Sequence, residues 1–434
     1  MDILTLEASA MSYPVNSSSI IEKRYKDAKE SYARLGVDSD KALKLLAKIS
    51  ISMHCWQGDD VGGFEVKDSK LSGGIMATGG FPGKPRSADE LRSDIEKAFS
   101  LIPGKHRLNL HAIYLETNGK FVDRDAISVK QFSRWLDWAK ERGIKLDFNP
   151  TFFSHPKAAS GYTLSSQDPA VRSFWVEHGK RCREIAADFA KKLNDISVLN
   201  FWIPDGAKDF PADRWSPRSR VMESLDRIFE GKANPKVKEA VEGKLFGIGS
   251  EEYVVGSHEF YFAYALTRKK LACLDMGHYH PTETIHDKLS AVLSFMPEAL
   301  IHVSRPIRWD SDHVVICNDD LINLARELVR GDALDRVFLA PDFFDASINR
   351  IGAWVIGMRS LQRALVFALL EPVKQLKALE KEGRGAELLA LSEECKELPH
   401  GAVWDYFCLR SGVPNGASWL NELRSYEKNV LMKR

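Results

Sequence analysis

The strongest constraint on the fold is an alternation of short apolar runs with longer amphipathic segments, repeated along most of the 434-residue chain. The short runs have the length and the β-branched or aromatic character of buried strands, and the segments between them have helical periodicity. Strands that alternate with helices favour an α/β fold with a parallel sheet, and eight strands are the number of a (β/α)8 TIM barrel. The runs cover residues 49–56, 107–115, 144–148, 196–202, 237–242, 271–274, 299–303 and 336–340.

The fifth strand has two possible placements, since periodicity allows either 237–242 or 244–249. The first is preferred because it puts Glu242 at the carboxyl end of a strand. The acids and histidines that follow the next three runs would then lie on the same face of the barrel.

Two segments lie outside the predicted barrel of residues 51–372. Residues 1–50 contain a helical pattern that predicts an N-terminal arm, and regularly spaced leucines in residues 373–434 predict a C-terminal helical extension for subunit contacts. After the first strand, three glycines within 58–63 predict a mobile loop that could close as a lid. Phe64 would then exclude water from a bound substrate or reach a neighbouring subunit.

Charge and cysteine usage favour a small ligand and the cytoplasm. The chain has 61 Lys+Arg and 60 Asp+Glu, so no excess charge indicates nucleic acid or a membrane surface as partner. Its N-terminal residues lack a basic, apolar leader, and no stretch has the ~18 apolar residues of a membrane-spanning helix. Because the six cysteines form no C-x-x-C pair and mostly sit in apolar patterns, we expect them to be reduced.

Acids and one histidine follow four successive strands of the second half of the barrel. Glu242, Asp275, His302 and Asp342 each end a different predicted strand. In a parallel barrel these ends point to the same face, so the four side chains can converge on one ion. Oxygen ligands with a single imidazole suit Mn²⁺, Mg²⁺ or Co²⁺ better than a metal that prefers thiolates.

A second group, His278 with Asp310 and Asp312, is expected slightly above the first, because an Asp-x-Asp loop can offer both carboxylates to one ion. Enough ligands exist without the other histidines of this region. These are therefore more consistent with support of the ligands or with a structural role, and they are His280, His286 and His313.

The remaining candidates would contact a substrate. Lys244 lies two residues beyond Glu242 and is a candidate catalytic residue, either as a proton donor to a developing oxyanion or as a surface lysine. His111 ends a strand and could bind a ligand hydroxyl or be a satisfied core histidine. Aromatic residues at other strand ends suit the apolar face of a sugar, or else belong to the core, and these are Trp56, Phe153 and Trp202.

Six long stretches resemble the L-rhamnose isomerase family, and the likeness runs from about residue 15 to the C-terminus. They are MHCWQGDDVGGFE (53–65), NFWIPDGAK (200–208), KLFGIGSEEYVVG (244–256), DMGHYHPTE (275–283), HVSRPIRWDSDHV (302–314) and DFFDASINRIG (342–352). The resemblance implies a homotetrameric, cytoplasmic, manganese-dependent (β/α)8 aldose–ketose isomerase that converts L-rhamnose to L-rhamnulose, the first step of rhamnose degradation.

The resemblance also implies two ion sites. His278, Asp310 and Asp312 match the manganese ligands of the family, and Glu242, Asp275, His302 and Asp342 match a second, more structural site that could also take Co²⁺ or Zn²⁺. Two ions can hold the oxygens on C1 and C2, the carbons between which the hydrogen moves, with Lys244 and Asp342 as the catalytic side chains. Because the acids are committed to ions, we expect a metal-assisted 1,2-hydride shift, with Asp205 or Asp345 as the base if a proton route operates instead.

Other functions remain possible from the residues alone. A metal-dependent phosphodiester hydrolase could use a similar ion cluster, although the balanced charge and the absence of a basic cluster near the ligands argue against it. A non-catalytic sugar-binding protein would need the aromatic contacts but not seven metal ligands. An isomerase that acts mainly on another aldose is the third alternative.

Overall fold

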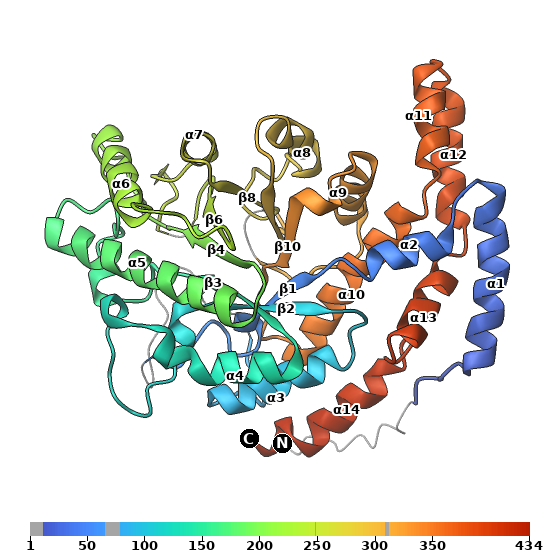
Figure 1. Cartoon of the computed structure of the whole chain (residues 1–434), viewed down its shortest axis with the longest axis horizontal. Helices are drawn as coiled ribbons and strands as arrows, with labels where there is room; N and C mark the ends of the chain where they lie inside the picture. The colour runs from blue at the N-terminus through green and yellow to red at the C-terminus, as the bar shows by residue number, and fades with distance from the viewer. Residues whose placement is uncertain (1–11, 66–78, 248, 309–311) are drawn as a thin grey trace, which may run out of the picture.

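The computed structural model describes residues 12–65, 79–247, 249–308 and 312–434, and its centre is a nearly closed barrel of parallel strands (Figure 1). All paired neighbours in the eight-stranded sheet are parallel, and the last strand returns to lie against the first. The strands are β1 (Ile51–His54), β2 (His106–His111), β3 (Lys145–Asn149), β4 (Ser197–Trp202), β6 (Val237–Glu242), β8 (Leu271–Asp275), β9 (Ala299–Val303) and β10 (Val337–Pro341).

The predicted (β/α)8 barrel is therefore confirmed, and the fifth strand occupies the preferred placement. The first two strands end earlier than expected, because the segment that follows each of them forms a 3₁₀ helix at the mouth of the barrel. These turns are η1 (Cys55–Gln57) and η2 (Ala112–Tyr114). A small antiparallel pair, β5 (Gly206–Ala207) with β7 (Tyr253–Val254), lies outside the barrel.

Helices cover the outside of the barrel, and their ends follow local capping chemistry. The Ser87 side chain accepts a hydrogen bond from the Glu90 amide, and Asp168 caps a helix that starts at Pro169. Gly143 ends a helix with φ of 66°, a left-handed conformation that glycine adopts without a Cβ clash. The helices are α3 (Ala88–Phe99), α4 (Ser133–Arg142), α5 (Pro169–Lys192), α6 (Trp215–Ile228), α7 (His258–Arg268), α8 (His286–Leu293), α9 (Asp319–Arg330) and α10 (Arg350–Leu369).

Helix α8 begins at His286, several residues after the end of β8. The intervening residues form a turn in which the Thr282 amide donates to Nδ1 of His280 and the Glu283 amide donates to the His280 carbonyl. These local bonds take up the polar groups that a helical turn would use. The other 3₁₀ turns are η3 (Arg124–Ala126), η4 (Val129–Phe132), η5 (Pro156–Ala158), η6 (Leu334–Arg336) and η7 (Leu431–Lys433).

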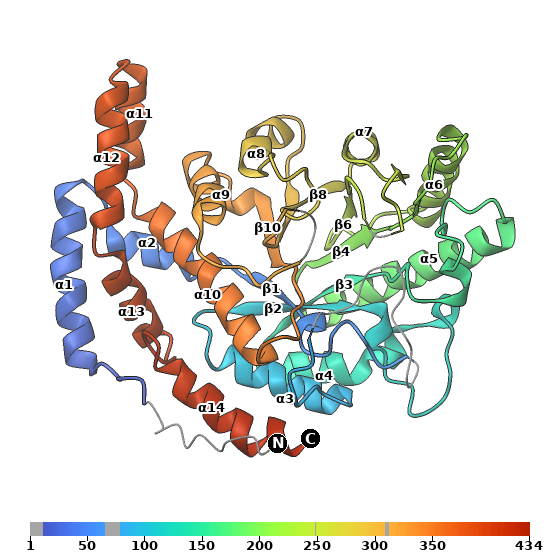
Figure 2. The ribbon, with the colours of Figure 1, turned by 180° about the vertical axis from the view of Figure 1, so that it is seen from behind.

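The terminal helices lie beside one another on one side of the barrel (Figure 2). Helix α1 packs along α13, where Tyr25 and Tyr406 stack with ring centroids 3.9 Å apart, and α11 and α12 project away from the barrel. The division into residues 1–50, 51–372 and 373–434 stays a proposal. The helices are α1 (Ser18–Arg34), α2 (Ser39–Leu46), α11 (Val373–Lys381), α12 (Gly385–Glu397), α13 (His400–Arg410) and α14 (Trp419–Asn429).

The glycine-containing loop after β1 is held in place by hydrogen bonds and an ion pair. Asp59 accepts hydrogen bonds from the Tyr114 hydroxyl, at 2.5 Å, and from the Gly63 amide, at 2.7 Å. Asp60 forms an ion pair with Arg350 of α10 at 2.7 Å. This conformation is packed against the barrel, and closure of the loop over a sugar stays a prediction.

Helix α10 is almost entirely buried between the barrel and α2, α3 and α9. In the part of the chain that the structure describes, no single helix is long and apolar enough to cross a membrane. One helix pair, α10 with α11, meets the length and composition criteria together but is bent by 57°.

The close packing of α10 on the barrel can be tested at Gly357. A Cβ at this position would lie 2.5 Å from two ring carbons of Phe343, the second residue after β10. We expect Gly357→Ala to lower the free energy of unfolding by about 1–3 kcal/mol through overpacking, as measured by denaturant titration.

Gly401→Ala is the matched control. This glycine also lies in a helix, α13, but a Cβ there would meet nothing within 4 Å. The control should be neutral or gain up to about 1 kcal/mol from the better helix propensity of alanine. Equal effects of the two substitutions would contradict the packing argument.

Candidate active site and metal cluster

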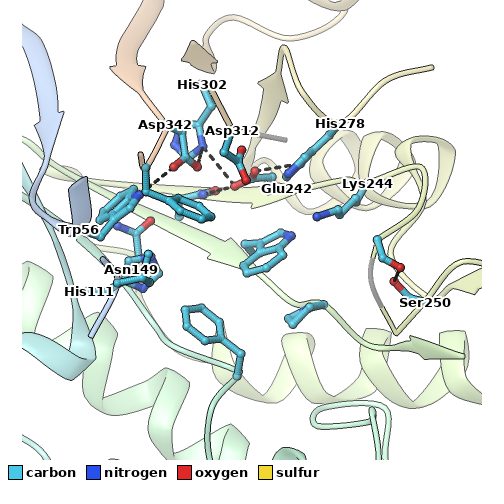
Figure 3. A pocket seen from close by; sticks show the side chains of 17 residues that line it. Trp56, His111, Asn149, Glu242, Lys244, Ser250, His278, His302, Asp312 and Asp342 are labelled. Atoms are coloured by element: carbon cyan, nitrogen blue, oxygen red, sulfur yellow. Dashed lines mark hydrogen bonds and ion pairs between the residues drawn. The ribbon is translucent and has the colours of Figure 1, made fainter. Parts of the chain in front are cut away.

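The candidate site is a cleft of about 810 Å³ at the carboxyl ends of the strands, partly open to solvent (Figure 3). Acids and histidines occupy one side of it, on β6, β8, β9 and β10, and aromatic and amide side chains occupy the other. Its lining residues are Trp56, Val61, His111, Asn149, Phe153, Asn200, Trp202, Pro204, Glu242, Lys244, Gly247, Ser250, His278, His302, Asp312, Asp342 and Phe344.

Four of the predicted ligands meet at the base of this cleft. One potential ligand atom from each of Glu242, Asp275, His302 and Asp342 lies within 4.8 Å of the others. Oxygens of the three acids approach Nδ1 of His302 to 3.4, 3.5 and 3.3 Å, in the order Glu242, Asp275 and Asp342. The cluster is a candidate metal-binding site.

The polar atoms of this cluster fit a bound cation. Among the described residues, Oδ2 of Asp275 and both ring nitrogens of His302 are buried and have no hydrogen-bond partner. Buried polar atoms without partners are costly, and a shared ion would satisfy several of them at once.

The charges of the clustered acids and histidines also favour a bound cation. Burial raises the pKa of Asp275. Burial also opposes ionisation of Glu242, yet His302 and His278 hold the pKa of that carboxyl well below its usual value. Three carboxyl groups this close together repel one another when ionised, so a divalent ion would stabilise the arrangement.

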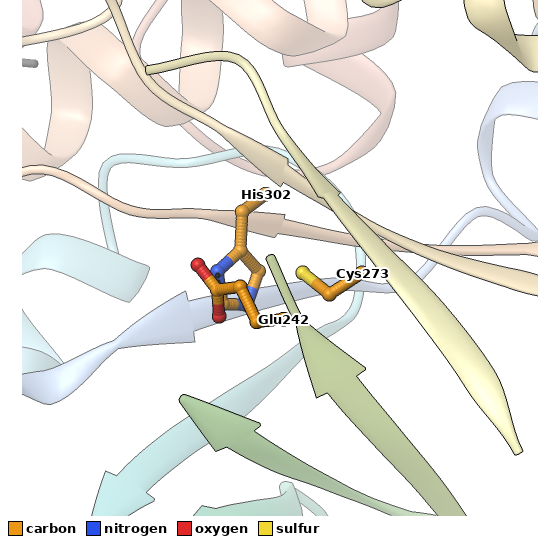
Figure 4. Close-up of side chains that lie close together, drawn as sticks. All are labelled: Glu242, Cys273 and His302. Atoms are coloured by element: carbon orange, nitrogen blue, oxygen red, sulfur yellow. Dashed lines mark ion pairs between the residues drawn. The ribbon is translucent and has the colours of Figure 1, made fainter. Parts of the chain in front are cut away.

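Cys273 lies next to the same cluster, although it was expected only as a core residue (Figure 4). Its sulfur, a carboxylate oxygen of Glu242 and a ring nitrogen of His302 lie within 4.8 Å of one another. Burial raises the pKa of the Cys273 thiol, which keeps the sulfur protonated. The oxygens of Asp275 and Asp342 therefore complete a better set of ligands for a hard ion.

The second predicted ion site is described only in part. His278 and Asp312 line the same cleft, whereas Asp310 lies outside the described residues. Nδ1 of His278 lies 3.1 Å from Glu242, which links the two groups. Asp312 has φ of 44°, an uncommon backbone conformation for a residue other than glycine, and its carbonyl accepts a hydrogen bond from the Phe344 amide. The three-residue set stays a prediction.

Lys244 projects into the cleft beside an aromatic wall. Its Nζ lies 5.0 Å from the centroid of the Trp202 ring, and that ring stacks against His278 with centroids 6.3 Å apart. A Cβ on Gly247 would lie 3.0 Å from Cε of Lys244, so the loop backbone passes close to the lysine stem. The ammonium and the cluster therefore face the same space.

The opposite wall contains the other predicted contact residues. Nε1 of Trp56 donates a hydrogen bond of 2.9 Å to Asp342, which orients one member of the ion cluster. His111 lies between Trp56 and Phe153, and its Nδ1 shares a hydrogen bond of 3.1 Å with the Thr151 hydroxyl. Burial lowers the pKa of His111 to about 3, so its ring is neutral at ordinary pH.

Phe64 does not line the cleft. Its ring packs edge-on against Tyr114, 5.9 Å between centroids, and its predicted contact with substrate stays a prediction. His280, His286 and His313 are also absent from the cleft lining.

The two carboxylates expected to act as a base in a proton route, Asp205 and Asp345, do not line the cleft. Asp205 accepts four hydrogen bonds from Thr163 and Ser165, and Asp345 accepts two from Ser347.

Sequence reasoning missed the amide side chains of the cleft. Asn200 on β4 donates a hydrogen bond to Glu242, and its Oδ1 has no partner among the described residues. Asn149 ends β3 and donates to Asn109 on β2 at 2.6 Å. For Asn200 the available signal was a polar residue within the apolar run of β4, at an inward position. Ser250, in the loop after β6, gave no signal.

Comparison with known proteins identifies the family. The L-rhamnose isomerase (RhaA) family matches residues 19–434. The chain is 57% identical to the L-rhamnose isomerase of Listeria innocua over 415 residues, which cover 95% of this chain and 99% of the relative. It is 55% identical to that of Mannheimia succiniciproducens over 417 residues, covering 96% and 100%. For Rhodopirellula baltica the values are 54% over 421 residues, covering 97% and 98%.

These matches cover nearly the whole of each protein and do not favour the phosphodiester hydrolase alternative. They agree with the cleft, in which a candidate ion cluster faces an aromatic wall. The chain belongs to the L-rhamnose isomerase family, and it is an aldose–ketose isomerase.

Proposed function

We propose that the protein interconverts L-rhamnose and L-rhamnulose in the cleft at the carboxyl ends of the strands. The observation that carries the proposal is the meeting of Glu242, Asp275, His302 and Asp342 at the base of a cleft that also contains Lys244. Relatives at 54–57% identity carry the name of this activity.

The residues fit two divalent ions, with Mn²⁺ as the proposed catalytic metal. Glu242, Asp275, His302 and Asp342 would hold one ion, for which Co²⁺ or Zn²⁺ is also suitable. His278 and Asp312, together with Asp310, would hold the other. When bound, such ions supply Lewis acidity to the carbonyl and hydroxyl oxygens of the open-chain sugar.

The side chains of the cleft then have separable tasks. The Lys244 ammonium, which lines the cleft beside the Trp202 ring, stabilises negative charge that develops on O1 of the sugar. Asp342, oriented by Trp56, directs its second oxygen toward the ion cluster and the O2 side. His111 contacts a sugar hydroxyl, and the apolar faces of Trp202 and Phe153 exclude water.

The commitment of the acids supports transfer of hydrogen within the substrate. Among the described residues that line the cleft, the carboxylates are Glu242, Asp312 and Asp342, all three proposed as ion ligands. Asp205 is saturated with hydrogen bonds, so it is a poor base. We infer a 1,2-hydride shift between C2 and C1 without a separate carbon base.

We also propose a homotetramer in the cytoplasm. The projecting α11–α12 hairpin supports subunit contact, since Leu389 on it is 62% exposed and few of its residues are buried in one chain. All six cysteines are free, which suits a reducing compartment.

An assay on a panel of aldoses tests the proposed substrate. We expect kcat/KM for L-rhamnose to exceed that for L-mannose, its 6-hydroxy analogue, by about tenfold or more, since an apolar wall favours a methyl group over a hydroxymethyl group. L-Lyxose and D-allose complete the panel. If none of these sugars is converted to a ketose, the proposed function is refuted. A preference for L-mannose would refute only the apolar subsite.

Metal removal tests the ion cluster. Exhaustive chelation should abolish turnover, and Mn²⁺ or Co²⁺ should restore it better than Mg²⁺. Glu242→Gln should reduce the metal retained after dialysis, as measured by elemental analysis. Glu298→Gln makes the same charge change at an ion pair with Lys238, away from the cleft, and should retain the normal content. Full turnover by protein shown to be metal-free would contradict the proposal.

Isotope labelling tests the route of the hydrogen. L-Rhamnose deuterated at C2 should give L-rhamnulose that keeps most of its deuterium at C1, because a hydride shift does not expose the hydrogen to solvent. Unlabelled sugar turned over in D₂O should take up little label. Mass spectrometry measures the deuterium content in both experiments. Extensive exchange of this hydrogen with solvent in both would instead indicate a proton route through a base.

A further inference from the structure

We propose that Thr151 is a positioning residue for His111, supported from behind by His178 and Arg124, so that Nε2 of His111 faces the sugar. This proposal rests on the proposed function, in which His111 contacts substrate. The four residues form one continuous hydrogen-bonded network that runs from helix α5 to the cleft.

Thr151 is fully buried just after β3, and each of its polar groups is engaged. Its amide donates to Nε2 of His178 at 2.9 Å, and its carbonyl accepts from Nη1 of Arg124 at 2.7 Å. These two bonds hold the backbone of Thr151 in place. The hydroxyl is left to pair with Nδ1 of His111 at 3.1 Å.

His178 of α5 has a defined tautomer. Because Nε2 accepts a hydrogen bond from a peptide N–H, it carries no proton, and the proton must lie on Nδ1. That nitrogen lies 3.0 Å from the Arg124 carbonyl, to which it donates. Burial lowers the pKa of His178 to about 3, which keeps the ring neutral and its acceptor available. The histidine thus links α5 to both Thr151 and Arg124.

Arg124 fixes the shape of the turn that follows Thr151. Its guanidinium donates to the carbonyls of Thr151, Phe153 and Ser154, at 2.7, 2.5 and 3.0 Å, and pairs with Glu65 at 2.9 Å. Ser154 has φ of 50°, so the chain reverses here through a conformation that non-glycine residues rarely adopt. The Arg124 hydrogen bonds offset that strain, and they also position Phe153, which lines the cleft.

The Thr151 hydroxyl selects one of two orientations of the His111 ring that packing alone does not distinguish. The His111 ring makes edge contacts with Trp56 and Phe153, with centroids 4.7 and 5.7 Å apart. These contacts restrict the plane of the ring, but a 180° flip of the imidazole fills nearly the same space. Only a polar partner distinguishes Nδ1 from the ring carbon, and the Thr151 hydroxyl is the side-chain partner that lies at Nδ1. Nε2 is then the nitrogen available to the cleft.

A double-mutant cycle between Thr151 and His111 tests this role. Thr151→Val removes the hydroxyl at constant shape and should lower kcat/KM for L-rhamnose by about tenfold, through loss of one hydrogen bond that orients the ring. Thr151→Ser restores the hydroxyl and should recover most of the loss. In a His111→Phe background, Thr151→Val should change kcat/KM by less than about twofold, because there is no imidazole left to orient.

Thr267→Val on the outer face of α7 is the control for deletion of a hydroxyl, and it should retain the parental kcat/KM. If Thr151→Val does not fold, Thr151→Ala enters the same cycle. Equal losses from the Thr151 substitution with and without His111 would overturn the proposal, as would failure of the serine variant to recover activity.

Failure of the proposed function would look different. If the parental protein does not isomerise L-rhamnose, the function itself is wrong. If it does and His111→Phe leaves kcat/KM unchanged, the contact between His111 and the sugar is wrong and the positioning role falls with it. A loss in His111→Phe without a loss in Thr151→Val would refute only the role of Thr151.

Discussion

Three carboxyl groups and one imidazole share a small, largely buried space at the carboxyl ends of β6, β8, β9 and β10. This arrangement is unfavourable for a chain without a cation, since the like charges repel one another and several polar atoms have no hydrogen-bond partner among the described residues. The barrel imposes it, because its parallel strands all end at the same mouth. Asp275 is paired with His302, Glu242 is paired with Cys273, and Asp342 follows the end of β10. Folding of the barrel therefore brings these mutually repelling carboxyl groups together, although they lie far apart in the sequence.

The other half of the cleft is built on a different principle. Its side chains are neutral; the Thr151 hydroxyl pairs with His111, and Asn149 donates to Asn109 and to the Leu110 carbonyl. Trp56 joins the two halves, since its ring contacts His111 and its Nε1 donates to Asp342. A polar open-chain sugar would lie between a charged, ion-binding side and a neutral side that provides orientation and apolar contact.

The rigidity of the neutral side comes from residues outside the cleft. Arg124 and His178 are almost wholly buried, and neither lines the cleft. They hold a turn with left-handed backbone at Ser154, which is maintained only while several carbonyl groups have their donors. Specific orientation at the surface of the cleft thus depends on polar groups that are satisfied one layer deeper.

The sequence by itself determined the barrel, its strands and the positions of the four candidate ligands at the ends of β6, β8 and β9 and just after β10, because apolar periodicity and strand ends are local signals. Cys273 and Thr151 gave no comparable signal, since their roles depend on partners 29 and 40 positions away that only the closed barrel brings near. Helix α8 starts only at His286 because local turn hydrogen bonds at His280 compete with a helix. Tertiary structure alone decided which side chains face the cleft and which of them lack partners, because both depend on contacts between segments distant in sequence.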